Sequence, residues 1–220
     1  SAGGDIEITG AIVGHTGGDE VLILDDNSGG SSTAVITLGG NVGADAGSAS
    51  LLKSVTAIAK GGIKLFGDIT TSSTADGAVT LTGPVTLEGD VTIDADAAAT
   101  TVTFNSTATV NSDGTAGGRD FEVNTSTGDL KMQGVLGGSA GLKSLKINSA
   151  TTGAADIEVQ NIGSSTIGVI GATTIGNSNT NKITLDGTVY RTTGAQTYTS
   201  AAGDKILAGA ASAPLTFTTT

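Results

Sequence analysis

The feature that most constrains this chain is a hexad written three times in succession. The segment 79–96 reads VTLTGP, VTLEGD and VTIDAD. Each hexad places apolar residues first and third, with Thr between them and turn-forming residues after them. Because side chains alternate across a strand, each hexad predicts a short strand with its apolar side chains on one face, followed by a corner. Three such strands predict one triangular coil.

Short alternating runs continue along the rest of the chain. They include Ile6 with Ile8, Val35 with Leu38, Ile63 with Leu65, Val102 with Phe104, Ile157 with Val159, and Ile183 with Leu185. Hairpin dipeptides of the Asn-Gly type are rare, which favours parallel stacking through repeated corners. We therefore predict an all-β fold: one elongated domain built as a parallel β-helix, or β-solenoid. The alternative is an antiparallel meander with tight turns.

The composition predicts a thin core. Gly, Ser, Thr and Ala make up more than half of the chain, and aromatic residues only 3%. Small side chains bury little apolar area, but the hydrophobic content of 37% is too high for a disordered chain. Taking roughly 20 residues per coil, we expect ten or eleven coils and a rod about 5 nm long. The aromatic residues are expected to fill coil interiors or cap gaps there: Phe66, Phe104, Phe121, Tyr190, Tyr198 and Phe217.

Internal repetition supports a solenoid of degenerate units. The segment 36–55 matches 130–145, and 89–104 resembles 203–217. These matches divide residues 1–220 into a partial unit and two longer units, approximately 1–33, 34–128 and 129–220. The C-terminal PLTFTTT, joined to the N-terminal SAGGDIEITG, would itself continue the repeats. We therefore expect a slice of a longer repetitive protein, or a subunit that stacks end to end. The opening residues do not have the pattern of a signal peptide, which is typical of a mature product or an internal fragment.

Three segments resemble the repeats of very large secreted bacterial surface proteins of the filamentous-haemagglutinin type. They are GGNVGADAGSASLLKSVTAIA, GPVTLEGDVTIDAD and TTGAQTYTSAAGDKILAGAASAPLTF. The resemblance covers most of the chain, although it does not include the secretion domain of such proteins. It implies a right-handed parallel β-helix, export to the cell surface, and a role as an adhesive fibre or stalk. It implies no catalytic residue to carry over.

The charge balance excludes some partners. The formal net charge is −11, and no basic patch interrupts it, so nucleic-acid binding is not expected. No apolar stretch approaches the ~18–20 residues of a membrane helix, so membrane insertion is not expected either. Cysteine is absent, which excludes disulfides and thiolate metal sites. The partners we expect are further copies or coils of the solenoid itself and a host or cell-surface ligand, in an extracellular setting.

Candidate chemical sites are few. His15 is the only histidine, and in the Gly-rich sequence VGHTGGDE it is interpreted as a loop residue rather than a catalytic or metal-binding one. The best carboxylate pairs are Asp25 with Asp26 and Asp94 with Asp96, which could bind calcium or simply form acidic corners. We assign no catalytic, cofactor-binding or metal-binding residue, and no cofactor.

Two function classes remain as alternatives to a structural or adhesive segment. A ligand-binding module could bind ice through T-x-T pairs, or carbohydrate through Tyr190 and Tyr198. The pairs are Thr80/Thr82, Thr101/Thr103, Thr107/Thr109, Thr197/Thr199 and Thr216/Thr218. A polysaccharide-degrading enzyme would need carboxylates beside a basic group in a groove, and Arg119 and Arg191 are the only arginines.

Overall fold

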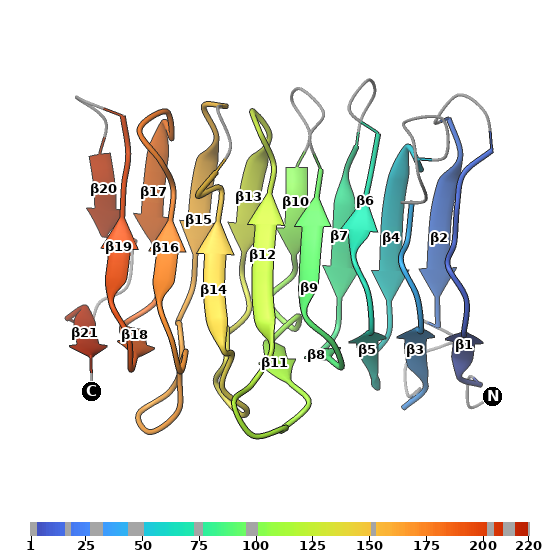
Figure 1. Cartoon of the computed structure of the whole chain (residues 1–220), viewed down its shortest axis with the longest axis horizontal. Helices are drawn as coiled ribbons and strands as arrows, with labels where there is room; N and C mark the ends of the chain where they lie inside the picture. Colours follow the sequence, from blue (N-terminus) through green and yellow to red (C-terminus); the bar gives the residue numbers. More distant parts are fainter. Residues whose placement is uncertain are drawn as a thin grey trace.

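The chain winds into a parallel β-solenoid of about seven turns, with the two termini at opposite ends (Figure 1). Every strand pair in the described residues is parallel, so the antiparallel alternative is wrong. The computed structural model describes residues 4–15, 19–26, 33–43, 51–72, 77–95, 101–150, 153–201, 205–208 and 214–219.

The strands stack into three faces, which the chain visits in a fixed order. Face 1 holds β1 (Ile6–Ile8), β3 (Val35–Leu38), β5 (Gly62–Leu65), β8 (Val85–Leu87), β11 (Val110–Ser112), β18 (Val189–Thr192) and β21 (Thr216–Thr219). Face 2 holds β6 (Ile69–Thr70), β9 (Val91–Asp94), β12 (Asp120–Asn124), β14 (Ser144–Ile147), β16 (Thr173–Ile175) and β19 (Gln196–Tyr198). Face 3 holds β2 (Val21–Asp25), β4 (Ser54–Ile58), β7 (Val79–Thr82), β10 (Thr101–Phe104), β13 (Asp129–Met132), β15 (Asp156–Val159), β17 (Lys182–Leu185) and β20 (Lys205–Ala208).

Isolated bridges complete the faces where regular strands are interrupted. On face 1 they join β11 to β18 through Leu136 and Ile162. On face 2 they extend the sheet beyond β6 to Val42 and Ile12. Each face is therefore one continuous column of paired residues.

The three hexads form one coil, as predicted. They give β7 on face 3, β8 on face 1 and β9 on face 2, and the apolar first and third residues of each are at most 2% exposed. Burial of each such side chain stabilises the fold by about 1.5–3 kcal/mol. At the first corner Gly83 has a φ of +118°, and a Cβ there would overlap the carbonyl oxygen of Ala59 on the turn below. Only glycine allows the turns to approach this closely.

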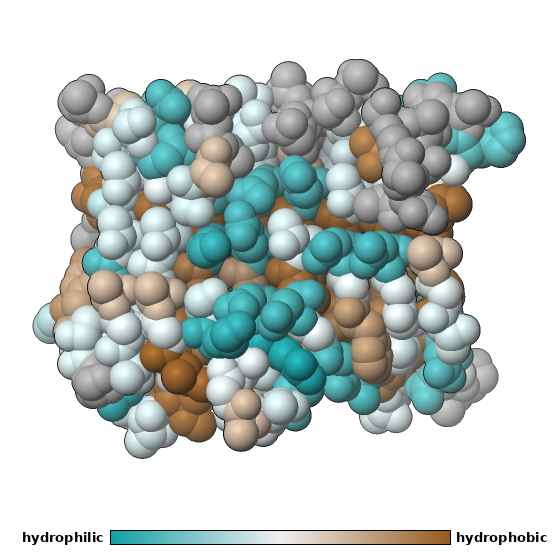
Figure 2. All heavy atoms as spheres, viewed as in Figure 1, coloured by the Kyte–Doolittle hydropathy of each residue, from teal (hydrophilic) through white to brown (hydrophobic). Residues whose placement is uncertain are grey.

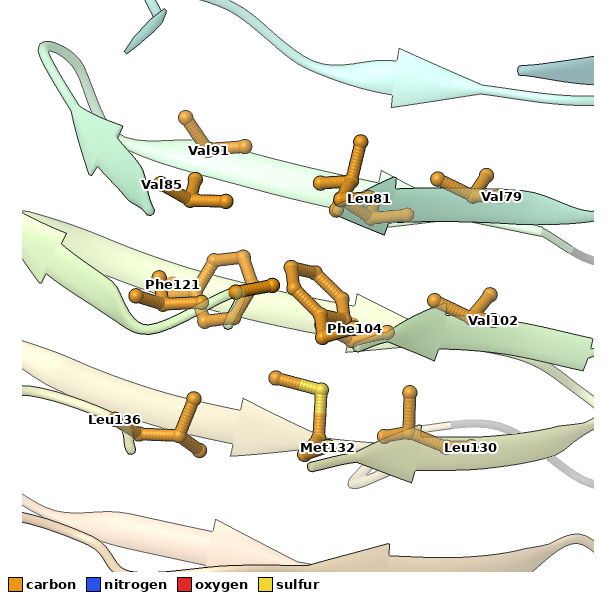
Figure 3. Packing of buried hydrophobic residues seen from close by; sticks show 14 of the residues in the cluster. Val79, Leu81, Val85, Val91, Val102, Phe104, Phe121, Leu130, Met132 and Leu136 are labelled. Carbon is orange, nitrogen blue, oxygen red and sulfur yellow. The ribbon is translucent and has the colours of Figure 1, made fainter. Parts of the chain in front are cut away.

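The core is a thin stack of inward-facing aliphatic side chains, widened by aromatic residues at one level (Figure 3). Phe104 on β10 and Phe121 on β12 meet edge to face, with ring centroids 5.8 Å apart at 83°. Such a pair contributes about 1 kcal/mol of stability beyond the contribution of burying the two rings. Tyr190 is also fully buried, but Phe66 is 47% exposed at a corner, so the expectation that it fills the interior is wrong.

The expected coil number was wrong because corners are longer than the hexads suggest. Leu22, Val55, Val79 and Val102 follow one another on face 3, so successive turns take 33, 24 and 23 residues rather than roughly 20. About seven turns therefore replace the expected ten or eleven. At the usual strand spacing the rod is roughly 35 Å long, not 5 nm.

The matching sequence segments do not lie on the same face. Residues 36–40 belong to face 1, whereas the matching residues 130–134 begin on face 3. Residues 51–55 run into β4 on face 3, and their counterparts 141–145 run into β14 on face 2. The two segments are displaced by one face in the same direction. The repeated element is thus a strand with its corner rather than a complete coil.

Candidate functional site

The acidic corners hold the turns of the solenoid in register. Asp68 Oδ1 accepts the backbone N–H of Thr92 at 2.7 Å, and Asp90 Oδ1 accepts that of Asp120 at 2.9 Å. In each case the carboxylate stands just before a strand, and the donor lies on the next turn toward the C-terminus. Other Asp and Asn side chains likewise accept a backbone N–H from the next turn toward the C-terminus. The acceptor and donor residues are Asp5 and Val35, Asn41 and Asp68, Asn111 and Ser139, Asp129 and Asp156, and Asn161 with both Thr188 and Val189.

The structure does not assemble the carboxylates considered for calcium. Asp25 ends β2 on face 3 and Asp26 follows it, whereas Asp94 ends β9 on face 2. Asp96 lies outside the described residues. Asp26 is 5% exposed, and its N–H donates to the carbonyl of Ile58. Among the described residues, no group of three or more His, Asp or Glu side chains is placed to hold a metal ion. His15 is exposed in a loop, as expected.

Charged side chains form pairs between adjacent turns. Lys182 Nζ lies 2.7 Å from Asp156 Oδ2 on face 3, and the two residues are directly opposite in the strand register. The hydrogen bond from Lys182 lowers the pKa of Asp156, and the same bond raises the pKa of Lys182. Both shifts favour the charged forms, so this carboxyl group is a poor proton donor and this amine a poor base near neutral pH.

The two arginines lie on different faces. Arg119 precedes β12 and binds the Asp113 carboxylate, which also accepts the N–H of Thr115 at 3.0 Å. The Arg119 hydrogen bond is the main cause that holds the pKa of Asp113 well below its usual range. Arg191 lies on β18 of face 1. The two arginines therefore do not share one site, and Arg119 is engaged with the Asp113 carboxylate in the corner before β12.

Face 2 carries most of its charge in the middle of the rod. Figure 2 shows hydrophilic side chains gathered over the middle strands of this face, where a shallow depression of about 370 Å³ lies. Its polar lining consists of Asp68, Asp90, Thr92, Asp120, Glu122, Ser144 and Lys146. Glu122 pairs with Lys146 at 3.8 Å, and the backbone bonds described above occupy one oxygen each of Asp68 and Asp90. These contacts tie neighbouring turns together.

The threonine pairs are spread over several faces. Thr80/Thr82 and Thr101/Thr103 lie on adjacent strands of face 3, but Thr80 is opposite Thr103, so the two pairs are offset. Thr107/Thr109 lies in the corner before β11, while the remaining pairs begin on β19 of face 2 and on β21 of face 1. The structure thus forms no array of all five pairs. Tyr190 is fully buried, and Tyr198 packs partly buried against the core at the C-terminal end, so the two rings do not form a platform on one of the three outer faces.

The most unusual surfaces are the two ends of the rod. We define the N-terminal face as the inward-facing side chains of the first coil: Ile6, Ile8, Ile12, Leu22 and Leu24. We define the C-terminal face as those of the last coil: Tyr198, Ile206, Leu215 and Phe217. The equivalent positions on inner turns are almost fully buried, but Ile206 is 46% and Phe217 50% exposed.

The C-terminal face is organised around an aromatic cluster. The ring of Tyr190 stacks on Phe217 with centroids 5.1 Å apart, and Tyr198 meets both rings edge to face. Gln196 Nε2 donates to the carbonyls of Tyr190 and Thr218, each at 3.0 Å, which links β18, β19 and β21. Burial raises the pKa of Tyr190 to about 12, so its hydroxyl stays protonated at physiological pH. The sequence did not indicate the role of Gln196, because its two partners lie on another face.

Comparison with known proteins returned no match: no family model, no curated protein and no solved structure is similar to this chain. Among the described residues there is also no helix with the length and apolar content that a membrane span requires.

Proposed function

We propose that this chain is a structural, non-enzymatic segment of an extracellular fibre or stalk that acts in adhesion at the cell surface. The observation that carries the proposal is that, among the described residues, the inward-facing apolar side chains at both ends of the rod are less buried than those of the inner turns, and the outer edges of the end strands have no described strand partner. Solenoid ends of this kind normally need a cap or a further coil, because their backbone donors and acceptors otherwise have only water as a partner. A rod that continues into more solenoid satisfies both needs.

The rest of the surface supports a mechanical role. The charged groups of faces 2 and 3 form pairs between turns, and the acidic corners accept backbone N–H groups from the next turn. These contacts reinforce the rod along its axis. The resemblance to filamentous-haemagglutinin repeats supports the extracellular setting and the adhesive role.

The proposal is tested by sedimentation velocity and negative-stain electron microscopy of the purified chain over a range of concentrations. We expect rods longer than the roughly 35 Å of one chain, with a proportion that grows with concentration. If every particle stays one chain long at all concentrations, self-stacking is contradicted.

A further inference from the structure

We propose that two copies of this chain stack head to tail by strand exchange, in which β1 of one copy displaces β21 of the other. The inference rests on the function proposed above and specifies its partner: a second copy of this chain. It follows from three observations. The first is the number of levels, or successive strand positions along the rod, on each face; the second is which residues are paired one above another in a column; the third is which charges would then meet.

The three faces do not have the same number of levels. Within the described residues, face 1 has nine, running from Ile6 through seven inner levels to Phe217. Face 2 has eight, from Ile12 to Tyr198, and face 3 has eight, from Leu22 to Ile206. Face 1 is thus occupied at both ends, by β1 and by β21.

This extra level prevents simple stacking. Suppose that β1 of a second copy is placed beyond β21 of the first copy. Ile12 and β2 of the second copy would then lie two levels beyond Tyr198 and β20 of the first. One level would then be empty on faces 2 and 3, and four strand edges would stay unpaired. If β1 instead takes the place of β21, all three edges meet at once. Tyr198 then faces Ile12 of the second copy, and Ile206 faces its Leu22, so apolar side chains meet on both faces.

The strand register places opposite charges together in the exchanged position. Ile6 and Tyr190 occupy the same column of face 1, so Glu7 occupies the column of Arg191. Substituting β1 for β21 therefore places Glu7 of the second copy opposite Arg191, where Thr218 now lies. Opposed charges on adjacent turns do pair in this solenoid, as Asp156 with Lys182 shows at 2.7 Å.

The contacts of β21 are compatible with its displacement. Within the described residues its one strand partner is β18, its Phe217 is half exposed, and Thr216 and Thr219 are exposed. Displacement would also break the hydrogen bond from Gln196 to the carbonyl of Thr218 and the contact of Tyr198 with Phe217. The gap left on Tyr190 by Phe217 would be filled by Ile6 of the second copy. As long as β21 stays paired, it blocks the edge of β18, so assembly of the full chain is slow.

The test compares the full chain with a chain ending at residue 213, which lacks β21, after circular dichroism has shown equal β content. We expect the shortened chain to form rods at least tenfold faster than the full chain. Light scattering measures the rate of assembly, and electron microscopy shows whether the particles are rods. Equal rates for the two chains would overturn the exchange but leave end-to-end stacking intact. If neither chain assembles, both the exchange and self-stacking are wrong.

Charge reversal tests the register without removing a strand. In the shortened chain, Glu7→Arg and Arg191→Glu should each slow assembly several-fold, and the double variant should recover the original rate. Lys131→Glu on β13 is the matched control, because it makes the same change of charge as Arg191→Glu on an exposed position away from both ends. Failure of the double variant to recover, or an equal effect of the control, would overturn the proposed register.

Discussion

The two ends of the rod are built differently. At the N-terminal end the described residues that close the interior are partly buried aliphatic side chains, such as Ile12 and Leu22. At the C-terminal end three aromatic rings pack together and the Gln196 amide links the last strands. Aromatic rings cover a wide opening with few side chains, and the amide supplies donors that a further coil would otherwise provide. Among the described residues, the C-terminal end is thus held together by aromatic contacts and amide hydrogen bonds, whereas the N-terminal end is held by the packing of aliphatic side chains.

The largest expected effect is at the C-terminal end. Tyr190→Ala removes a fully buried ring that stacks on Phe217, and should lower the free energy of unfolding by about 4 kcal/mol. Tyr190→Phe removes only the hydroxyl, which accepts the N–H of Gly187 and donates to the carbonyl of Val159, and should cost about 1 kcal/mol. Urea unfolding followed by circular dichroism measures both. Similar losses for the two variants would show that the ring itself does not hold this end together.

The N-terminal end should tolerate the shortening of a side chain better than the inner turns do. Ile12→Ala should cost about 1.5 kcal/mol, because the side chain is only partly buried. The matched variant is Ile69→Ala, two levels inward in the same column and fully buried, which should cost about 3 kcal/mol. Equal losses, measured by urea unfolding in dilute solution, would mean that the N-terminal face is covered.

The amide at the C-terminal end should act locally. Gln196→Ala removes three hydrogen bonds: the two that the amide donates to the carbonyls of Tyr190 and Thr218, and the one that it accepts from the Tyr198 hydroxyl. It should cost at least about 1 kcal/mol. Its effect should be concentrated in β21, whose backbone amides should exchange faster with deuterium while those of β9 stay unchanged. Exchange that stays slow in β21 would show that the Phe217 contact alone holds the strand.

The smallest expected effect concerns the ion pair on face 3. Because the pKa of Asp156 is lowered, its contribution to stability is present above the ordinary carboxyl pKa of about 4 and is lost as the pH falls through the lowered value. The Lys182 side chain is 41% exposed and that of Asp156 is 33% exposed, so solvent screens the pair. Asp156→Asn should therefore lower the free energy of unfolding by only about 0.5 kcal/mol at pH 7. The difference from the unchanged chain should shrink as the pH falls below the ordinary carboxyl pKa and vanish once the Asp156 carboxyl is protonated. A difference that persists after protonation would assign the effect to the hydrogen bonds of Asp156 rather than to its charge.

The sequence predicted the local pattern well. The hexads indicate which residues face inward, because the alternation of side chains is a property of each strand alone. The same reasoning failed for Val35, since the inward positions of β3 are Ile36 and Leu38. In the run VITL two neighbouring residues are apolar, and only pairing with β1 and β5 decides between them.

Features that depend on the next turn were not predictable. The number of coils depends on corner length, which the strand pattern does not encode. The acidic corners were recognised, but not their partners, because Asp68 and Asp90 bond to residues one turn away. The exposed position of Phe66 has the same origin: whether an aromatic residue after a strand turns inward depends on how its corner packs on the neighbouring turns.

The most direct test of end-to-end stacking is hydrogen–deuterium exchange of the full chain at increasing protein concentration. In dilute solution we expect rapid exchange in β2 and strong protection in β9 and β14. As rods form, protection should appear together in β2 and β20, while the inner strands stay unchanged. Protection of β2 already in the dilute single chain, or rods that form without any change at β2 and β20, would contradict the account.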